Sequence, residues 1–107
     1  MGNVYKVTFS PEAEEAIYER AKYIAIHSGS RIIADRYISG LKKFCESLSI
    51  FPHRSEKRDD LHPELYVTNY RGTDIIAYEI DENTKSVHIS DIVHSARDYE
   101  RVLRYPD

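Results

Sequence analysis

Residues 4–13 read VYKVTFSPEA, and this stretch passes from a strand pattern straight into the start of a helix. Apolar side chains alternate with polar ones between Tyr5 and Phe9, as they do on a β-strand with one buried face. Ser10 can then cap a helix by accepting a backbone N–H, and Pro11 suits the first helical position. The stretch therefore predicts an N-terminal strand that leads directly into a helix.

Two amphipathic helices follow, with a very short turn between them. Residues 11–27 carry apolar side chains at helical spacing on one face. Ser28-Gly29 offers a stop signal, and Ser30 can cap the second helix at once. The apolar stripe of that second helix comprises Ala34, Ile38, Leu41, Cys45 and Leu48. Helices joined by so short a turn are expected to lie antiparallel.

The second half of the sequence predicts a loop followed by three strands. Residues 53–62 are polar with charges of both signs, so we expect an exposed loop in which Arg58 is solvated and balanced by nearby acids. Strand patterns follow at 65–70, 75–80 and 87–93, with short turns between them. The predicted fold class is α+β, with an N-terminal strand, an antiparallel helical hairpin and a three-stranded antiparallel meander forming one twisted sheet.

Length and composition indicate a single domain over residues 1–107, with 95–107 as a C-terminal tail or short helix. A hydrophobic content of 41% and a charged content of 31% suit a soluble globular protein. No apolar run reaches transmembrane length, and the N-terminus lacks a signal-peptide core. Cys45 is the only cysteine and lies in an apolar helical pattern, so we interpret it as a core thiol. The cytoplasm is the expected compartment.

The charge balance and the histidines restrict the possible ligands. The net charge of −3 argues against a protein that grips nucleic acid directly through phosphates. We find no Gly-rich nucleotide loop and no acyl-transfer motif, and no cofactor is predicted. The histidines considered as metal ligands are His53, His62, His88 and His94. They have no metal-ligand spacing, so no metal site is predicted.

Six short motifs, taken together, resemble a known family. They are SPEA at 10–13, YIA at 23–25, LSIFP at 48–52, DLHPEL at 60–65, IAYEID at 76–81 and IVHSARD at 92–98. In this order and spacing the sequence resembles the ParE branch of the RelE/ParE superfamily of bacterial toxins, also described as plasmid stabilisation proteins. The resemblance covers residues 5–98 and implies a twisted antiparallel sheet with the helical hairpin packed against it.

The resemblance also implies partners. Such a protein is the toxic half of a type II toxin–antitoxin pair, and its cognate antitoxin is ParD-like or related. The antitoxin represses the operon with one half and folds over the toxin with the other, so contact with DNA is indirect and no membrane is involved. The ParE branch implies growth arrest through inhibition of DNA gyrase. The RelE branch implies cleavage of mRNA on the ribosome.

RNA cleavage would need a base, an acid and a cation that steadies the phosphorane. His94 and Tyr99 are candidates for an acid–base pair, and Arg71 or Arg97 for the phosphate clamp. However, the middle strands contain no Arg or Lys and the chain is acidic overall. We therefore favour a toxin that binds gyrase and is not an enzyme. A degenerate remnant that binds only its antitoxin is a further alternative, because the arginine common on the second meander strand of the family is missing here.

The C-terminal stretch holds the residues that we expect to bind the target. They are Arg97, Tyr99, Arg101, Arg104 and Tyr105. Arginine and tyrosine are enriched among the residues that dominate protein–protein affinity. We expect the antitoxin to cover apolar surface of the helical hairpin and to add a strand at a sheet edge.

Overall fold

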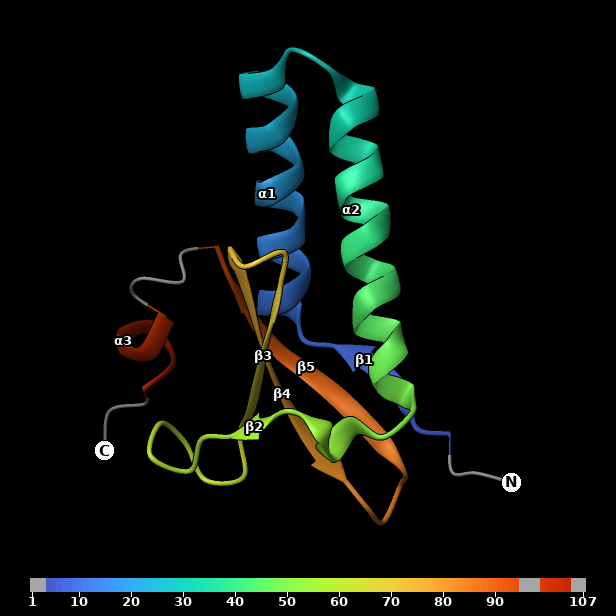
Figure 1. Ribbon diagram of the computed structural model, residues 1–107, viewed down its shortest axis with the longest axis vertical. Coiled ribbons are helices and arrows are strands. Elements are labelled where there is room, and N and C mark those ends of the chain that lie inside the picture. The colour runs from blue at the N-terminus through green and yellow to red at the C-terminus, as the bar shows by residue number, and fades with distance from the viewer. Residues whose placement is uncertain (1–3, 95–98, 105–107) are drawn as a thin grey trace.

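The computed structural model describes residues 4–94 and 99–104. They form a five-stranded mixed sheet in the order β1-β5-β4-β3-β2, with a long helical hairpin against one face (Figure 1). The strands are β1 (Lys6–Phe9), β2 (Glu56–Lys57), β3 (Tyr66–Tyr70), β4 (Asp74–Asp81) and β5 (Ser86–Val93). The helices are α1 (Pro11–Ser28), α2 (Arg31–Glu46) and α3 (Tyr99–Leu103), and the 3₁₀ turns η1 (Ser47–Ser49) and η2 (Pro52–Arg54) follow α2.

The sheet is mixed, which corrects the expectation of a fully antiparallel sheet. Strands β3, β4 and β5 pair antiparallel in sequence order. Strand β1, in contrast, pairs parallel to β5, with Val7 opposite Val87. Short turns force antiparallel pairing only on the strands that they connect. The whole helical hairpin separates β1 from the other strands along the chain. No short turn therefore sets the direction of β1.

The segment expected to be an exposed loop contributes the far edge of the sheet. In β2, Glu56 pairs with Val67 and Lys57 pairs with Tyr66. Leu61, a few residues later, is only 3% exposed. The polar composition of residues 53–62 therefore hid both an edge strand and a core residue.

Ser10 joins the first helix to the middle of the sheet and confirms the predicted cap. Its hydroxyl accepts a hydrogen bond from the backbone N–H of Ala13 at 2.9 Å and donates one to the carbonyl of Ser90 at 2.7 Å. Ser90 lies where the register between β4 and β5 shifts next to Ala77 and Tyr78. The cap thus also binds a carbonyl at the β-bulge, where one strand carries an extra residue.

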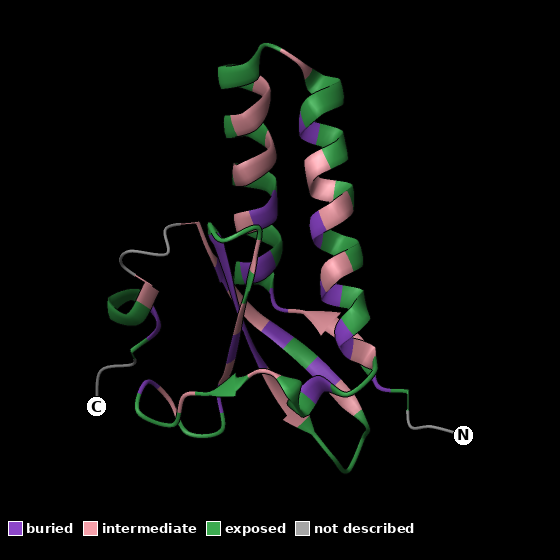
Figure 2. Cartoon of the chain, in the orientation of Figure 1, coloured by how far each residue is buried: buried purple, intermediate pink, exposed green. Residues whose placement is uncertain are grey.

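The helical hairpin extends well beyond the sheet, and only its lower half packs on it (Figure 2). Gly29 adopts a left-handed conformation with a φ of 71° and ends α1, and the Ser30 side chain caps α2. These are the predicted stop and start. No helix formed by the described residues is long and apolar enough to cross a membrane.

Each face of the sheet covers its own core. The larger core lies under the hairpin and includes Ile17, Leu41, Cys45, Leu48, Ile76, Tyr78, Val87 and Ile89. The smaller core lies on the other face and includes Leu61, Leu65, Val67, Ile75, Ala77 and Leu103. Cys45 is fully buried, as its sequence pattern predicted. Leu103 belongs to α3, so this helix packs against the sheet through the smaller core.

Candidate functional site

A buried polar cluster joins the helical hairpin to the sheet. Its centre is Asp74, which is fully buried at the start of β4. The Tyr37 hydroxyl donates to Asp74 Oδ2, and His94 Nδ1 lies 3.0 Å from Asp74 Oδ1. Arg20 Nε lies 3.6 Å from the same Oδ1 atom. The cluster thus connects α1, α2, β4 and the residue that follows β5.

The surroundings of Asp74 favour its ionised form. Burial raises the pKa of this carboxyl, but hydrogen bonds from His94 and Tyr37 and the charge of Arg20 outweigh burial, so the pKa lies below its usual value. Burial and the hydrogen bond to Asp74 together raise the pKa of Tyr37. Arg20 Nε is buried without a hydrogen-bond acceptor among the described residues.

His94, the expected acid or base, is held by structural contacts at both ring nitrogens. Nδ1 faces Asp74, and Nε2 lies 2.9 Å from the carbonyl oxygen of Ala16 in α1. Tyr99, its expected partner in RNA cleavage, accepts a hydrogen bond from Arg58 instead. Among the described atoms, no hydrogen bond joins the His94 and Tyr99 side chains. The predicted acid–base pair is therefore not assembled in this structure.

Arg71, the expected phosphate clamp, lies in the turn between β3 and β4 with a φ of 57°. Its guanidinium lies 5.6 Å from the ring centre of Tyr70 and 5.9 Å from that of Tyr37. Arg71 therefore borders the Asp74 cluster through Tyr37. Arg97, the alternative clamp, lies outside the described residues.

Helix α3 is docked through Arg58, which corrects the interpretation of Arg58 as a solvated loop residue. Its guanidinium donates to the Tyr99 hydroxyl at 2.8 Å, to Glu100 Oε2 at 2.8 Å and to both Asp60 oxygens at 2.8 and 2.9 Å. Only 12% of the Arg58 side chain is exposed. The hydrogen bonds from Arg58 lower the pKa of Asp60 to about 2, and those that it makes to Asp60 and Glu100 raise the pKa of Arg58.

The remaining expected target-binding residues differ in how far they are exposed. Leu103 is 2% exposed and packs into the smaller core, whereas Arg101, Val102 and Arg104 are exposed. Tyr99 is partly buried, and its hydroxyl is bound by Arg58. Tyr105 lies, with Arg97, outside the described residues.

The upper half of the hairpin carries an exposed apolar surface, which we call the distal hairpin surface. It comprises Tyr23, Ile26, Ile32 and Ile33, each at least 50% exposed. Single exposed apolar residues are common, but a group of this size at the end of α1 and the start of α2 is a candidate site for a partner. Tyr23 is further ordered by stacking on His27, with ring centres 3.9 Å apart.

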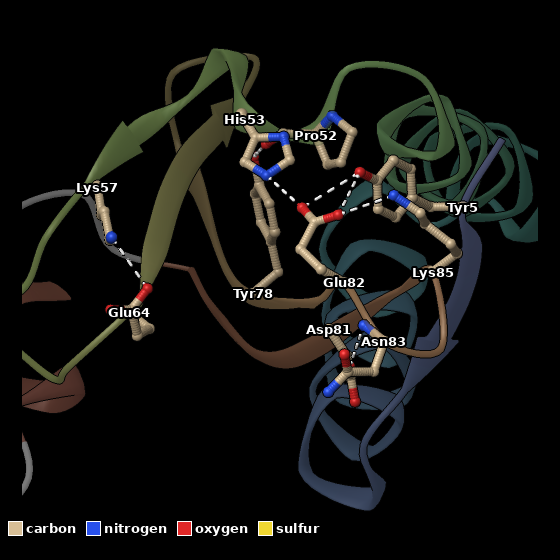
Figure 3. Close-up of polar contacts among 10 residues, drawn as sticks. All are labelled: Tyr5, Pro52, His53, Lys57, Glu64, Tyr78, Asp81, Glu82, Asn83 and Lys85. Carbon is tan, nitrogen blue, oxygen red and sulfur yellow. Dashed lines mark hydrogen bonds and ion pairs between the residues drawn. The ribbon is translucent and has the colours of Figure 1, made fainter. Parts of the chain in front are cut away.

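A second polar cluster lies at the opposite end of the sheet and has a structural role. Glu82, in the turn between β4 and β5, faces His53 Nε2 at 2.7 Å, the Tyr5 hydroxyl at 2.9 Å and Lys85 Nζ at 3.0 Å (Figure 3). Hydrogen bonds from Lys85, Tyr5 and His53 lower the pKa of Glu82. The side chains of this cluster use one another as partners, and they tie the N-terminal strand to the segment after α2. In the part of the chain that the structure describes, no three His, Cys, Asp or Glu side chains are grouped to hold a metal ion.

Sequence reasoning missed Arg20, Arg58 and Asp74. For Asp74 the sequence held a signal. In two antiparallel strands joined by a turn, the first residue of one strand lies beside the last residue of the next. A lone acid before the apolar stretch 75–80 and a histidine just after 87–93 were therefore candidates for a buried pair. For Arg20 and Arg58 the sequence holds no comparable signal, since both lie among many charged residues.

Comparisons with known proteins agree with this architecture. The family model for the ParE toxin of type II toxin–antitoxin systems, parDE, matches residues 7–99. A chain of the chromosomal ParDE toxin–antitoxin system from P. aeruginosa is similar, with a TM-score of 0.73 at 12% identity, over 88% of this chain and 99% of that chain. A chain of the toxin–antitoxin complex RelBE2 from Mycobacterium tuberculosis is similar with a TM-score of 0.66 at 21% identity, over 90% and 97% of the two chains. No curated protein matches the sequence significantly. At these identities the two structural likenesses concern the fold.

Proposed function

This chain belongs to the ParE toxin family of type II toxin–antitoxin systems, and from that premise we propose that it arrests bacterial growth by binding DNA gyrase in the cytoplasm. The action is stoichiometric binding and not catalysis. A cognate, ParD-like antitoxin neutralises the toxin by covering part of its surface. DNA is reached only through the antitoxin or through the target.

The observation that carries this proposal is the state of His94. A general acid or base needs a ring nitrogen that can reach the substrate. Both nitrogens of His94 are instead used within the fold, by Asp74 and by the carbonyl of Ala16. The Tyr99 hydroxyl is likewise bound by Arg58. These contacts support a binding protein over a ribonuclease.

The target-binding surface that we propose is the outer side of α3. Arg101, Val102 and Arg104 are exposed there, while Leu103 and Arg58 hold the helix on the sheet. Arg97 and Tyr105 flank this helix in sequence and complete the proposed set. A rigidly docked helix loses little conformational entropy on binding, which favours affinity.

We propose that the antitoxin occupies the distal hairpin surface and adds a strand at an edge of the sheet. Burying exposed isoleucine and tyrosine side chains supplies the apolar contact area that such an interface needs. The similar chains come from a toxin–antitoxin system and a toxin–antitoxin complex, which supports a partner of this kind.

The test compares two target assays with one pair of variants. The purified chain is added to a gyrase supercoiling reaction and, separately, to translating ribosomes. We expect linear DNA trapped with gyrase, uncut mRNA, and loss of the gyrase effect when Arg101→Ala is combined with Arg104→Ala. The control combines Lys42→Ala with Lys43→Ala, which removes the same charge from exposed positions on α2.

The other outcomes identify the alternatives. Cleavage of mRNA at the ribosome would contradict the proposal and support the RelE-type activity. No effect on gyrase and no mRNA cleavage, together with tight antitoxin binding, would support a degenerate remnant. Truncation after Asp98 is a poorer test than the double variant, because it also removes Leu103 from the smaller core.

A further inference from the structure

We propose that Arg71, whose guanidinium lies over the rings of Tyr37 and Tyr70, is an anchor for a carboxylate side chain of the antitoxin. We call this set the Arg71 anchor. The inference rests on the proposed function, because it concerns the partner that covers the distal hairpin surface. It adds the chemistry of that partner, namely an apolar segment whose end carries Asp or Glu.

The first support is the geometry around Tyr37. The guanidinium of Arg20 lies 5.4 Å from the centre of this ring, and that of Arg71 lies 5.9 Å from it. Arg71 also lies 5.6 Å from the Tyr70 ring. Aromatic faces attract guanidinium groups and orient them. The forked donors of Arg71 are thus held by two rings while the residue remains exposed.

The second support is the charge around these groups. Among the described residues, Asp74 is the carboxylate that lies with Arg20, and it is fully buried and engaged by Tyr37 and His94. Arg71 makes ring contacts and no ion pair within the described chain. The buried acid therefore pairs with Arg20 alone, and an incoming carboxylate would meet the unneutralised charge of Arg71, whose planar fork suits it.

The third support is continuity with the distal hairpin surface. Arg20 also lies 5.6 Å from the ring of Tyr23, which is 52% exposed and belongs to that surface. Ile33, also in that surface, precedes Tyr37 by four residues and therefore lies on the same face of α2. One face of the hairpin thus runs from exposed apolar side chains to exposed positive charge. An amphipathic helix with an acidic end matches this order.

The experiment uses the cognate antitoxin that the proposed function requires and measures its dissociation constant for three full-length proteins at low and at physiological salt. The first is the natural protein and the second is Arg71→Asn, since asparagine tolerates the positive φ of this turn. The third is Arg31→Asn, a control with the same loss of charge at an exposed position two residues before Ile33, on the other side of α2. Thermal unfolding of all three verifies that they fold alike.

We expect Arg71→Asn to weaken binding about tenfold and to flatten its salt dependence, and Arg31→Asn to change it less than about twofold. A double-mutant cycle then pairs Arg71→Asn with each Asp→Asn and Glu→Gln change in the antitoxin. At least one acidic residue should couple to Arg71.

Each other result is decisive. Equal binding by the natural protein and Arg71→Asn, or a cycle without coupling, would overturn the anchor and leave the proposed function standing. Failure of the natural protein to bind the antitoxin would overturn both. If Arg71→Asn instead abolished binding of the free chain to duplex DNA and left antitoxin binding unchanged, Arg71 would serve a phosphate, and the carboxylate anchor would be wrong.

Discussion

The Nδ1 atom of His94 lies 3.0 Å from the Oδ1 atom of Asp74, at the point where the end of β5 meets the start of β4. The other ring nitrogen of His94 reaches the carbonyl of Ala16 in α1. One histidine therefore ties the sheet to the first helix. Its place in the sequence suggested catalysis, whereas its contacts indicate that it holds the hairpin in position.

Replacing Asp74 by asparagine should strongly destabilise the fold. Asp74→Asn keeps the size of the side chain but leaves Arg20 and His94 without their carboxylate. Removing one member of a buried charged group typically costs about 3–5 kcal/mol. Urea unfolding at neutral pH measures the change. Asp35→Asn, at an exposed position on α2, is the matched control and should change stability by less than about 0.5 kcal/mol. A loss below 1 kcal/mol for Asp74→Asn would contradict the structural role assigned to this cluster.

The same variant should change how stability depends on pH. The pKa of Asp74 is lower in the folded protein than its usual value, so the folded state favours the ionised carboxylate. Its contribution is complete above the unfolded pKa of about 3.9 and is lost as the pH falls through the folded pKa below that value. Urea midpoints measured from pH 6 down to pH 2.5 should therefore fall less steeply for Asp74→Asn than for the natural protein. Parallel curves would show that Asp74 titrates normally.

Gly40 should be required because Tyr70 lies over it. A Cβ atom at position 40 would collide with the Tyr70 hydroxyl, although the Cζ atom of that ring would stay at 3.5 Å. Alanine favours a helix over glycine by about 1 kcal/mol, but we expect the clash to outweigh this gain, so that Gly40→Ala lowers stability by about 1–2 kcal/mol. Tyr70 cannot simply move aside, since Tyr37 and Phe44 pack against its ring at 5.5 Å.

A second substitution isolates this clash. Adding Tyr70→Phe removes the hydroxyl and should restore most of the stability that Gly40→Ala loses, while Tyr70→Phe alone serves as the reference. Thermal or urea unfolding of the four proteins gives the coupling energy. Additive effects would mean that the hydroxyl is not the obstacle.

Arg58→Ala should release α3 from the sheet. The substitution removes the donors that bind Tyr99 and Glu100, and leaves Leu103 and the ring of Tyr99 as the contacts of the helix with the smaller core. Amide hydrogen exchange in residues 99–104 should become at least about tenfold faster, because a short helix is unstable without tertiary contacts. The control is Lys57→Ala, at the position just before Arg58, which breaks an exposed ion pair with Glu64. Unchanged exchange in Arg58→Ala would show that the apolar contacts of Leu103 and Tyr99 dock the helix without Arg58.

Cys45 should be inert while the protein is folded. Burial, with a smaller effect of Glu46, raises the pKa of the thiol to about 12, so almost no thiolate exists at pH 8. Ellman's reagent should react with the thiol at the rate of global unfolding in native buffer and rapidly in 6 M guanidinium chloride. Fast native reaction would contradict the position of Cys45 in the core.

The caps, helix ends and apolar stripes of this fold could be predicted from the sequence, because each depends on residues close by in the chain. Ser10 and Ser30 are N-caps and Gly29 ends α1, as their residue types and places predicted. The apolar stripes of the two helices and the alternation in β4 and β5 identified most of the larger core. Capping, turn formation and periodic burial are set within a few residues, and so a single sequence carries them.

What the sequence by itself determined is therefore the order of the two long helices and of strands β1, β3, β4 and β5, their approximate ends and the family pattern that they carry. Only the tertiary structure decided that β1 runs parallel to β5, that Arg58 holds α3, and that Asp74 gathers Arg20, Tyr37 and His94. These partners lie from 20 to 54 positions away from Asp74, and the contacts of Arg58 with the tail span 41 and 42 positions. Periodicity and propensity extend over one or two helical turns, whereas a buried charge finds its partner only after the chain has folded.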